Sequence, residues 1–159
     1  MQAGMRPLLL DTNLLLLYLV GGKDPLLIAN SRRLNAYEES DYYLLIRFIE
    51  QKGFDSFVST PHILTEASNL LGQEKERTKS VGREAISEYV QHCKEIVCAA
   101  NLLVDEPEYQ RLGLTDVAIK MASRLPVFVL TVDALLYHHL SSEGLEVVNF
   151  NHVRQGSWS

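Results

Sequence analysis

Four acidic residues stand beside apolar segments, where the carboxylates of an ordinary soluble surface are not expected. They are Asp11, Glu66, Asp116 and Asp133. Asp11 directly follows a run of three leucines, and Asp133 follows the longer apolar run at 127–132. Glu66 and Asp116 each lie among core-forming residues near the start of a predicted helix. A fold that brought these four side chains together would concentrate negative charge in one place.

Carboxylates that share a cleft repel one another unless a multivalent cation offsets their charge. Mg²⁺ or Mn²⁺ is the cation that such an oxygen-rich group favours. The only two cysteines, Cys93 and Cys98, have no second Cys/His pair that would complete a zinc site, and we expect them to be small buried residues. A hard cation activates water and stabilises charge on a phosphoryl oxygen. The predicted reaction is therefore metal-assisted hydrolysis of a phosphodiester.

Strands alternate with helices along the chain. Apolar runs of strand length occur at 7–10, 54–59, 127–132 and 146–150. Apolar residues at helical spacing predict helices at 41–52 and at 81–97. This alternation predicts an α/β fold with a mainly parallel central sheet flanked by helices, whose ligand site lies at the carboxyl ends of the strands.

Local signals mark where several helices begin and end. Thr60 followed by Pro61 predicts an N-cap and first helical position, which places Glu66 in the second turn. Thr115 is the expected cap of the helix that carries Asp116. Three glycines each predict the end of the helix that comes before them: Gly53, Gly72 and Gly144. Each of the four acids, taken singly, is also explained as a turn former, a helix cap or a solvated residue. Their joint occurrence favours a site.

The acids stand within motifs that resemble the PIN-domain family. These motifs are Leu8 to Leu15 around Asp11-Thr12-Asn13, Thr60 to Glu66, Leu112 to Ile119, and Val129 to Asp133, in the family's order and spread over residues 7–150. The resemblance implies a Rossmann-like sheet and an Mg²⁺- or Mn²⁺-dependent ribonuclease site. It further implies that Asp11 is the central metal ligand, that Glu66 and Asp116 complete the main site, and that Asp133 binds a second metal or positions water.

The same resemblance implies supporting hydrogen bonds from Thr12, Asn13 and Thr131, for which turn and cap chemistry is the alternative. Many small members of the family are toxins of bacterial toxin–antitoxin pairs, as in the VapC-like group. An antitoxin protein and a homodimer are therefore expected partners beside the RNA substrate.

The composition fits one domain of 159 residues, with a core at about 7–150 and a loose tail at 151–159. The formal charge of −5 argues against a protein that holds nucleic acid simply through excess positive charge. Local basic residues would then have to attract RNA: Lys75, Arg77, Lys79 and Arg83, or Arg111, Lys120 and Arg124 beside Asp116. Both groups are equally explained as solvated helix faces. No apolar run approaches the length of a membrane span, and a cytoplasmic location is expected.

Two other functions are compatible with these residues. The first is a catalytically inactive PIN-like module that binds RNA or a protein. The second is a haloacid-dehalogenase-like phosphatase, because Asp11 also ends a strand in that fold. That chemistry needs a second aspartate two residues further on, where this chain has Asn13.

Overall fold

Five short parallel strands form the centre of the structure, a computed structural model that describes residues 6–156. The strands are β1 (Leu8–Leu10), β2 (Phe57–Ser59), β3 (Cys93–Glu95), β4 (Phe128–Thr131) and β5 (Val147–Asn149). Their order across the sheet is β3-β2-β1-β4-β5, and every neighbouring pair is parallel. The α/β class predicted from the alternation of elements is therefore confirmed.

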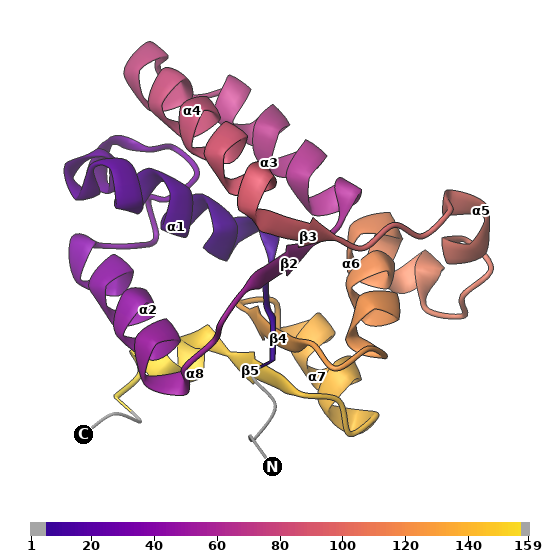
Figure 1. The fold of residues 1–159 in the computed structure, drawn as a ribbon. Coiled ribbons are helices and arrows are strands. Elements are labelled where there is room, and N and C mark those ends of the chain that lie inside the picture. The colour runs from indigo at the N-terminus through magenta and orange to yellow at the C-terminus, as the bar shows by residue number, and fades with distance from the viewer. Residues whose placement is uncertain (1–5, 157–159) are drawn as a thin grey trace.

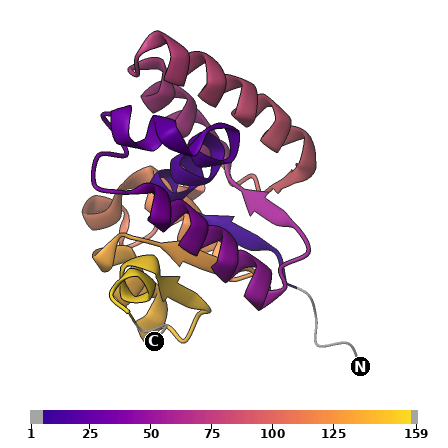
Figure 2. The same ribbon diagram turned by 90° about the vertical axis from the view of Figure 1, so that its left-hand side faces the viewer.

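Helices connect the strands and flank the sheet (Figure 1). They are α1 (Thr12–Lys23), the 3₁₀ helix η1 (Pro25–Asn30), α2 (Glu39–Lys52), α3 (Pro61–Gly72), α4 (Glu76–His92), α5 (Ala100–Leu103), α6 (Tyr109–Ser123), α7 (Ala134–Ser142) and α8 (Phe150–Arg154). Helices α1 and α2 lie on one side of the sheet, which faces the viewer in Figure 2, and α6 and α7 lie on the other.

The hydrophobic core is built around β1 and α1. All three leucines of β1 are buried, as expected for a central parallel strand that is covered on both faces. Helix α1 carries leucines on nearly every side and packs against α2, α3 and α4. A helix that is apolar all round is stable only when it is enclosed in this way. The strand and helix on either side of Asp11 therefore anchor it in the hydrophobic core.

Strand β3 is absent from the sequence prediction. The apolar stripe at 81–97 predicts helix throughout, but α4 ends at His92 and the chain continues as β3. This short edge strand carries a lysine and a glutamate, so its residues show no alternating apolar pattern. Pairing with β2 decides its conformation, which the local sequence does not reveal. The expectation that Cys93 and Cys98 are buried is also wrong, because both side chains are only partly covered.

The C-terminal region extends the core further than expected. The predicted loose tail at 151–159 is wrong for its first residues, because α8 buries Phe150 and Val153. The Arg154 Nε atom donates to Asp41 Oδ1 at 3.0 Å and thereby fastens α8 to α2. The end of the tail, 157–159, lies outside the described residues. Within residues 6–156 the structure contains no helix that is long and apolar enough to span a membrane.

Candidate metal and active site

The strand order reverses between β1 and β4. The chain moves from β1 outward to β2 and β3, then crosses back to place β4 on the opposite side of β1. Connections on either side of such a reversal lead away from each other and leave a crevice at the carboxyl ends of the two strands. Asp11 follows β1 and Asp133 lies two residues beyond the end of β4. The two acids therefore stand at the place where a ligand is expected in this type of sheet.

The Asp11 carboxylate is buried and held from three directions. Its Oδ1 atom caps α1 by accepting from the Leu14 N–H at 2.9 Å. Its Oδ2 atom accepts from the Thr131 hydroxyl at 2.6 Å and from the Val132 N–H at 2.7 Å. Burial raises the pKa of Asp11, and these three hydrogen bonds partly offset that rise. Asp11 is thus a rigidly oriented carboxylate at the base of the site.

Thr131 links Asp11 to Asp133. Its hydroxyl donates to Asp11 and accepts from the Asp133 N–H at 3.0 Å. The Asp133 side chain is exposed and caps α7 by accepting from the Leu136 N–H at 3.0 Å. The cap explanation therefore holds for both acids, yet the same caps aim both carboxylates at one edge of the sheet.

Glu66 and Asp116 come from α3 and α6, two helices that contact each other. Glu66 lies on α3, whose start follows the prediction: the Thr60 hydroxyl accepts from the Ile63 N–H at 3.2 Å. Thr115 does not cap a helix as expected. Instead its hydroxyl donates to Glu66 Oε2 at 2.9 Å, a contact between α6 and α3. The helical path of α6 is interrupted just before it, at Gly113, whose φ of +85° favours glycine.

All four acids line one cavity of about 350 Å³. Its other walls are Thr12, Asn13, Arg33, Leu112, Gly113, Leu114, Thr115 and Ile119. Asp116 is half-buried there, and burial together with the charges of Asp133, Asp11 and Glu66 raises its pKa to about 7. The four predicted acids and two of the three predicted supporting residues, Thr12 and Asn13, therefore meet in one place, and the third, Thr131, lies directly behind it.

The cavity fits a hard divalent cation. It offers carboxylate oxygens, and the charges of Asp133, Asp11 and Glu66 add to burial in raising the pKa of Asp116. The four acids are nevertheless not packed tightly around a single point. Among residues 6–156, only Glu108, His139 and Glu143 bring three ligand atoms within 4.8 Å of one another. An ion in the cavity would accordingly use water for part of its coordination, as Mg²⁺ commonly does.

The tighter group around Glu108 is already occupied by a lysine. The Lys120 side chain is almost fully buried, and its Nζ donates to Glu108 at 2.5 Å. This bond is the main reason that the pKa of Glu108 is lowered. The same ammonium lies 3.7 Å from Glu143, so a metal ion would meet a positive charge there. We therefore do not treat this group as a metal site.

The position of Lys120 corrects one sequence interpretation. Lys120 does not face phosphates beside Asp116, because it points into the core between α6 and α7. Arg111 donates towards His139 Nδ1 at 3.4 Å, and Arg124 pairs with Glu106 at 3.5 Å. The solvated-face explanation suits the two arginines better, and Lys120 has a structural role.

The other basic group lies at the start of α4. Lys75 precedes the helix, and Arg77 and Arg83 are exposed on it, while Lys79 is partly covered. Arg77 pairs with Asp24 at 3.2 Å. None of these four residues lines the acid cavity. Arg33 does line it, and sequence inspection missed it because it lies in an irregular segment with no motif or periodicity.

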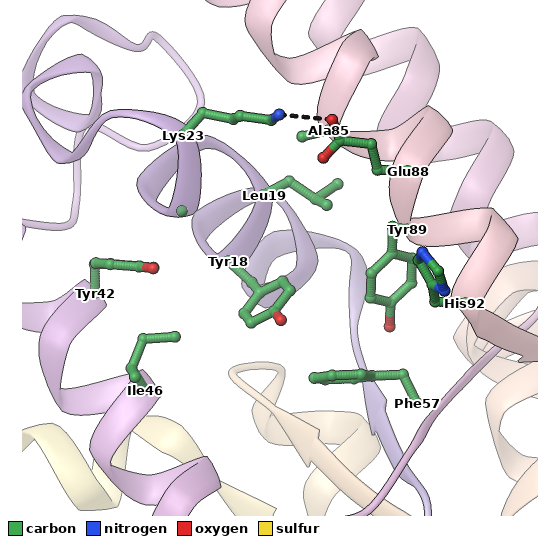
Figure 3. Close-up of a pocket in the computed structure, with 11 residues that line it drawn as sticks. Tyr18, Leu19, Lys23, Tyr42, Ile46, Phe57, Ala85, Glu88, Tyr89 and His92 are labelled. Carbon is green, nitrogen blue, oxygen red and sulfur yellow. Dashed lines mark hydrogen bonds and ion pairs between the residues drawn. The ribbon is translucent and has the colours of Figure 1, made fainter.

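A larger cavity, of about 460 Å³, lies elsewhere between α1, α2 and α4 (Figure 3). Aromatic rings of Tyr18, Tyr42, Phe57 and Tyr89 line it, and the Lys23–Glu88 ion pair crosses its rim at 2.8 Å. Burial raises the pKa of Tyr89, so this phenol stays protonated. The cavity contains none of the four acids and offers packing surface without an evident reacting group.

Comparison with known proteins adds no identification: the sequence matches neither a protein-family model nor a curated protein. The site is therefore interpreted from its own geometry.

Proposed function

We propose that this protein is an endoribonuclease of the PIN type that hydrolyses RNA phosphodiester bonds with Mg²⁺ or Mn²⁺. The observation that supports this most strongly is the convergence of Asp11, Glu66, Asp116 and Asp133 on one polar cavity at the reversal of strand order. Four acids from four separate parts of the chain repel one another there, which is costly for folding unless a cation offsets it. The order of the motifs in the sequence supports the same function.

In this proposal each residue has a distinct task. A bound Mg²⁺ or Mn²⁺ ion would activate water and stabilise charge on the scissile phosphate. Asp11 would be the central ligand, because its hydrogen bonds hold both oxygens in a fixed orientation. Thr131 would keep that orientation, as residues behind metal ligands commonly do. Glu66, steadied by Thr115, and Asp116 would complete the main site, and Asp133 at the exposed side would bind a second ion or orient water.

Cleavage of labelled RNA, both unstructured and structured, tests this function. We expect cleavage with Mg²⁺ or Mn²⁺, and its loss on adding a chelator and in Asp11→Asn and Asp116→Asn. Asp105→Asn is the matched control, because it removes one exposed carboxylate outside the cavity. If the two cavity variants cleave as fast as Asp105→Asn, the proposal is wrong.

A second candidate is a PIN-like module that binds RNA or protein without cleaving. It is favoured by one observation: in residues 6–156 no three of the four acids bring ligand atoms within 4.8 Å of one another. Calorimetry separates the two functions. Heat of Mg²⁺ or Mn²⁺ binding that disappears in Asp116→Asn supports the nuclease, whereas no uptake by the folded protein supports the inactive module.

We further propose that the protein acts in the cytoplasm as the toxin of a toxin–antitoxin pair. This narrower proposal rests on the resemblance of the motifs around the four acids to those of the PIN-domain family. An antitoxin would cover the acids, for which an arginine side chain is a suitable group. Induced synthesis without a partner should slow bacterial growth, and Asp116→Asn should abolish the effect. Normal growth with an active enzyme would count against a toxin. A homodimer is expected on the same basis and is tested by light scattering.

A further inference from the structure

Arg33 is the one positively charged residue that lines the acid cavity in the described part of the chain. Its side chain is exposed, and its guanidinium forms no hydrogen bond or ion pair with another residue of 6–156. An arginine beside four carboxylates would be expected to pair with one of them. Because it does not, its five N–H donors stay available to a ligand at the mouth of the cavity.

The backbone that carries Arg33 is held by a buried carboxylate. Glu74, in the turn between α3 and α4, accepts from the Ser31 hydroxyl at 2.8 Å. It also accepts from the N–H groups of Arg32 at 3.2 Å and of Arg33 at 3.0 Å. Glu74 is only 9% exposed although it carries a charge. The segment donates three hydrogen bonds to this one buried carboxylate, and they fix the backbone position of Arg33.

Glu74 also joins two basic regions of the surface. Lys75, which directly follows it, begins the basic stretch that continues along α4. The segment that follows η1 is thereby fastened against the turn at the start of α4, at the end of the α3–α4 pair. In this way the backbone of Arg33, whose side chain lines the acid cavity, is tied to the turn that precedes Lys75.

The charges define what Arg33 would bind. Cations are drawn to the four acids, whereas a phosphodiester approaching the same cavity is repelled by them. A guanidinium at the rim offers two parallel donors to phosphate oxygens and offsets part of that repulsion. Single strands suit this position, because one arginine contacts one phosphate without having to fit a duplex groove.

We infer that Arg33 binds a phosphate of single-stranded RNA at the mouth of the acid cavity, and that Glu74 positions Arg33 for this contact. The inference rests on the proposed function for its substrate class. Arg33 is a binding residue and Glu74 acts only through it.

Fluorescence anisotropy with a labelled single-stranded 12-nucleotide RNA tests the contact, with the full chain and Mg²⁺ present. All variants carry Asp116→Asn, so that the RNA stays intact. We expect Arg33→Ala to weaken binding about tenfold. The slope of log K against log salt should fall by about 0.7, the value for one lost phosphate contact on a single strand. Arg33→Lys should restore the slope and part of the affinity. Arg47→Ala, which removes an exposed charge from α2, is the control.

Glu74→Gln distinguishes positioning from simple charge. If only the overall charge matters, removing a negative charge should strengthen RNA binding. We expect this result for the control Glu50→Gln, which changes an exposed residue of α2. If Glu74 positions Arg33, binding weakens instead, and Glu74→Gln has no further effect once Arg33 is alanine. Ser31→Ala removes one donor to Glu74 without changing charge, so it tests the same anchor should Glu74→Gln fold poorly.

The outcomes separate this inference from the proposed function. If Arg33→Ala binds RNA as well as Arg47→Ala does, the inference is overturned even when the parent protein cleaves RNA. If the parent protein binds RNA through Arg33 but never cleaves it, the nuclease proposal fails and the inference stands. If no RNA binding occurs at low salt, the inference is overturned whatever the cleavage assay shows.

Discussion

Replacing Asp116 with asparagine should make the metal-free protein more stable while it removes the proposed activity. In the folded protein the pKa of Asp116 is raised from 3.8 to about 7, first by burial and then by Asp133, Asp11 and Glu66. The rise spans about three pH units, and each unit corresponds to about 1.4 kcal/mol of free energy, so the ionised carboxylate costs at most about 4 kcal/mol. Asparagine occupies nearly the same volume without the charge.

The measured gain should be smaller than this ceiling. The Asp116 side chain is only half-buried, so solvent screens part of the repulsion. The asparagine amide must also be desolvated. We therefore expect a gain of about 1–2 kcal/mol in the free energy of unfolding above pH 7. In a chain of this size that corresponds to about 2–8 °C in Tm.

The pH dependence gives the sharper test. A carboxyl group whose folded pKa is raised stabilises the fold fully below its unfolded value of 3.8, and this contribution is lost as the pH rises towards 7. Asp116→Asn has no carboxyl group at this position, so its stability does not fall in this pH range for that reason. The advantage of Asp116→Asn should therefore be complete at pH 8 and shrink towards zero as the pH falls to 4.

Urea unfolding at several pH values, with a chelator present, measures this difference. Asp105→Asn is the control, because that exposed carboxylate lies outside the cavity. Added Mg²⁺ should then reverse the order, because an ion that binds only the folded state raises the Tm of the parent more than that of the variant. The reasoning is refuted if Asp116→Asn is no more stable than the parent at pH 8, or if its gain is as large at pH 4 as at pH 8.

Three further substitutions test a buried hydrogen bond, a close helix contact and a buried ion pair. Thr131→Val removes the donor to Asp11 and the acceptor of the Asp133 N–H, so the free energy of unfolding in urea should fall by about 1–3 kcal/mol. The control Thr65→Val, at an exposed position, should lower it by less than about 0.5 kcal/mol. Gly82→Ala would bring a Cβ within 2.4 Å of Leu71 Cδ2 and should lower stability by about 1–3 kcal/mol. Gly22→Ala is the control, because its added Cβ would lie 3.5 Å from the nearest atom, the Tyr42 hydroxyl, and it should be neutral or stabilising in the same assay. Equal losses of stability in Gly82→Ala and Gly22→Ala would contradict the close contact between Gly82 and Leu71. Lys120→Met should lower the Tm, because it leaves Glu106 and Glu108 without their buried cation; an unchanged Tm would show that the acids find water instead.

The sequence by itself determined the parts of the protein that depend on local chemistry. Short apolar runs identify four of the five strands, most clearly β1 and β4, which are buried at every position. Thr60 and Pro61 identify the start of α3, because capping involves only the first helical turn. The same local signals identified Asp11, Glu66, Asp116 and Asp133 as acids at the ends of apolar segments.

Only the tertiary structure decided which residues meet. Asp11 and Thr131 are 120 positions apart, and their contact depends on β4 returning to the side of β1. Thr115 carries a cap signal, yet it donates to Glu66 on another helix, because packing of α6 against α3 brings a partly buried carboxylate within reach. Local sequence also does not reveal that Glu74 accepts hydrogen bonds from the segment around Arg33. Nor does it reveal that residues 93–95, at the end of an apolar stripe with helical spacing, pair with β2 as strand β3. Such contacts join distant segments, and their free energy exists only once the chain has folded around them.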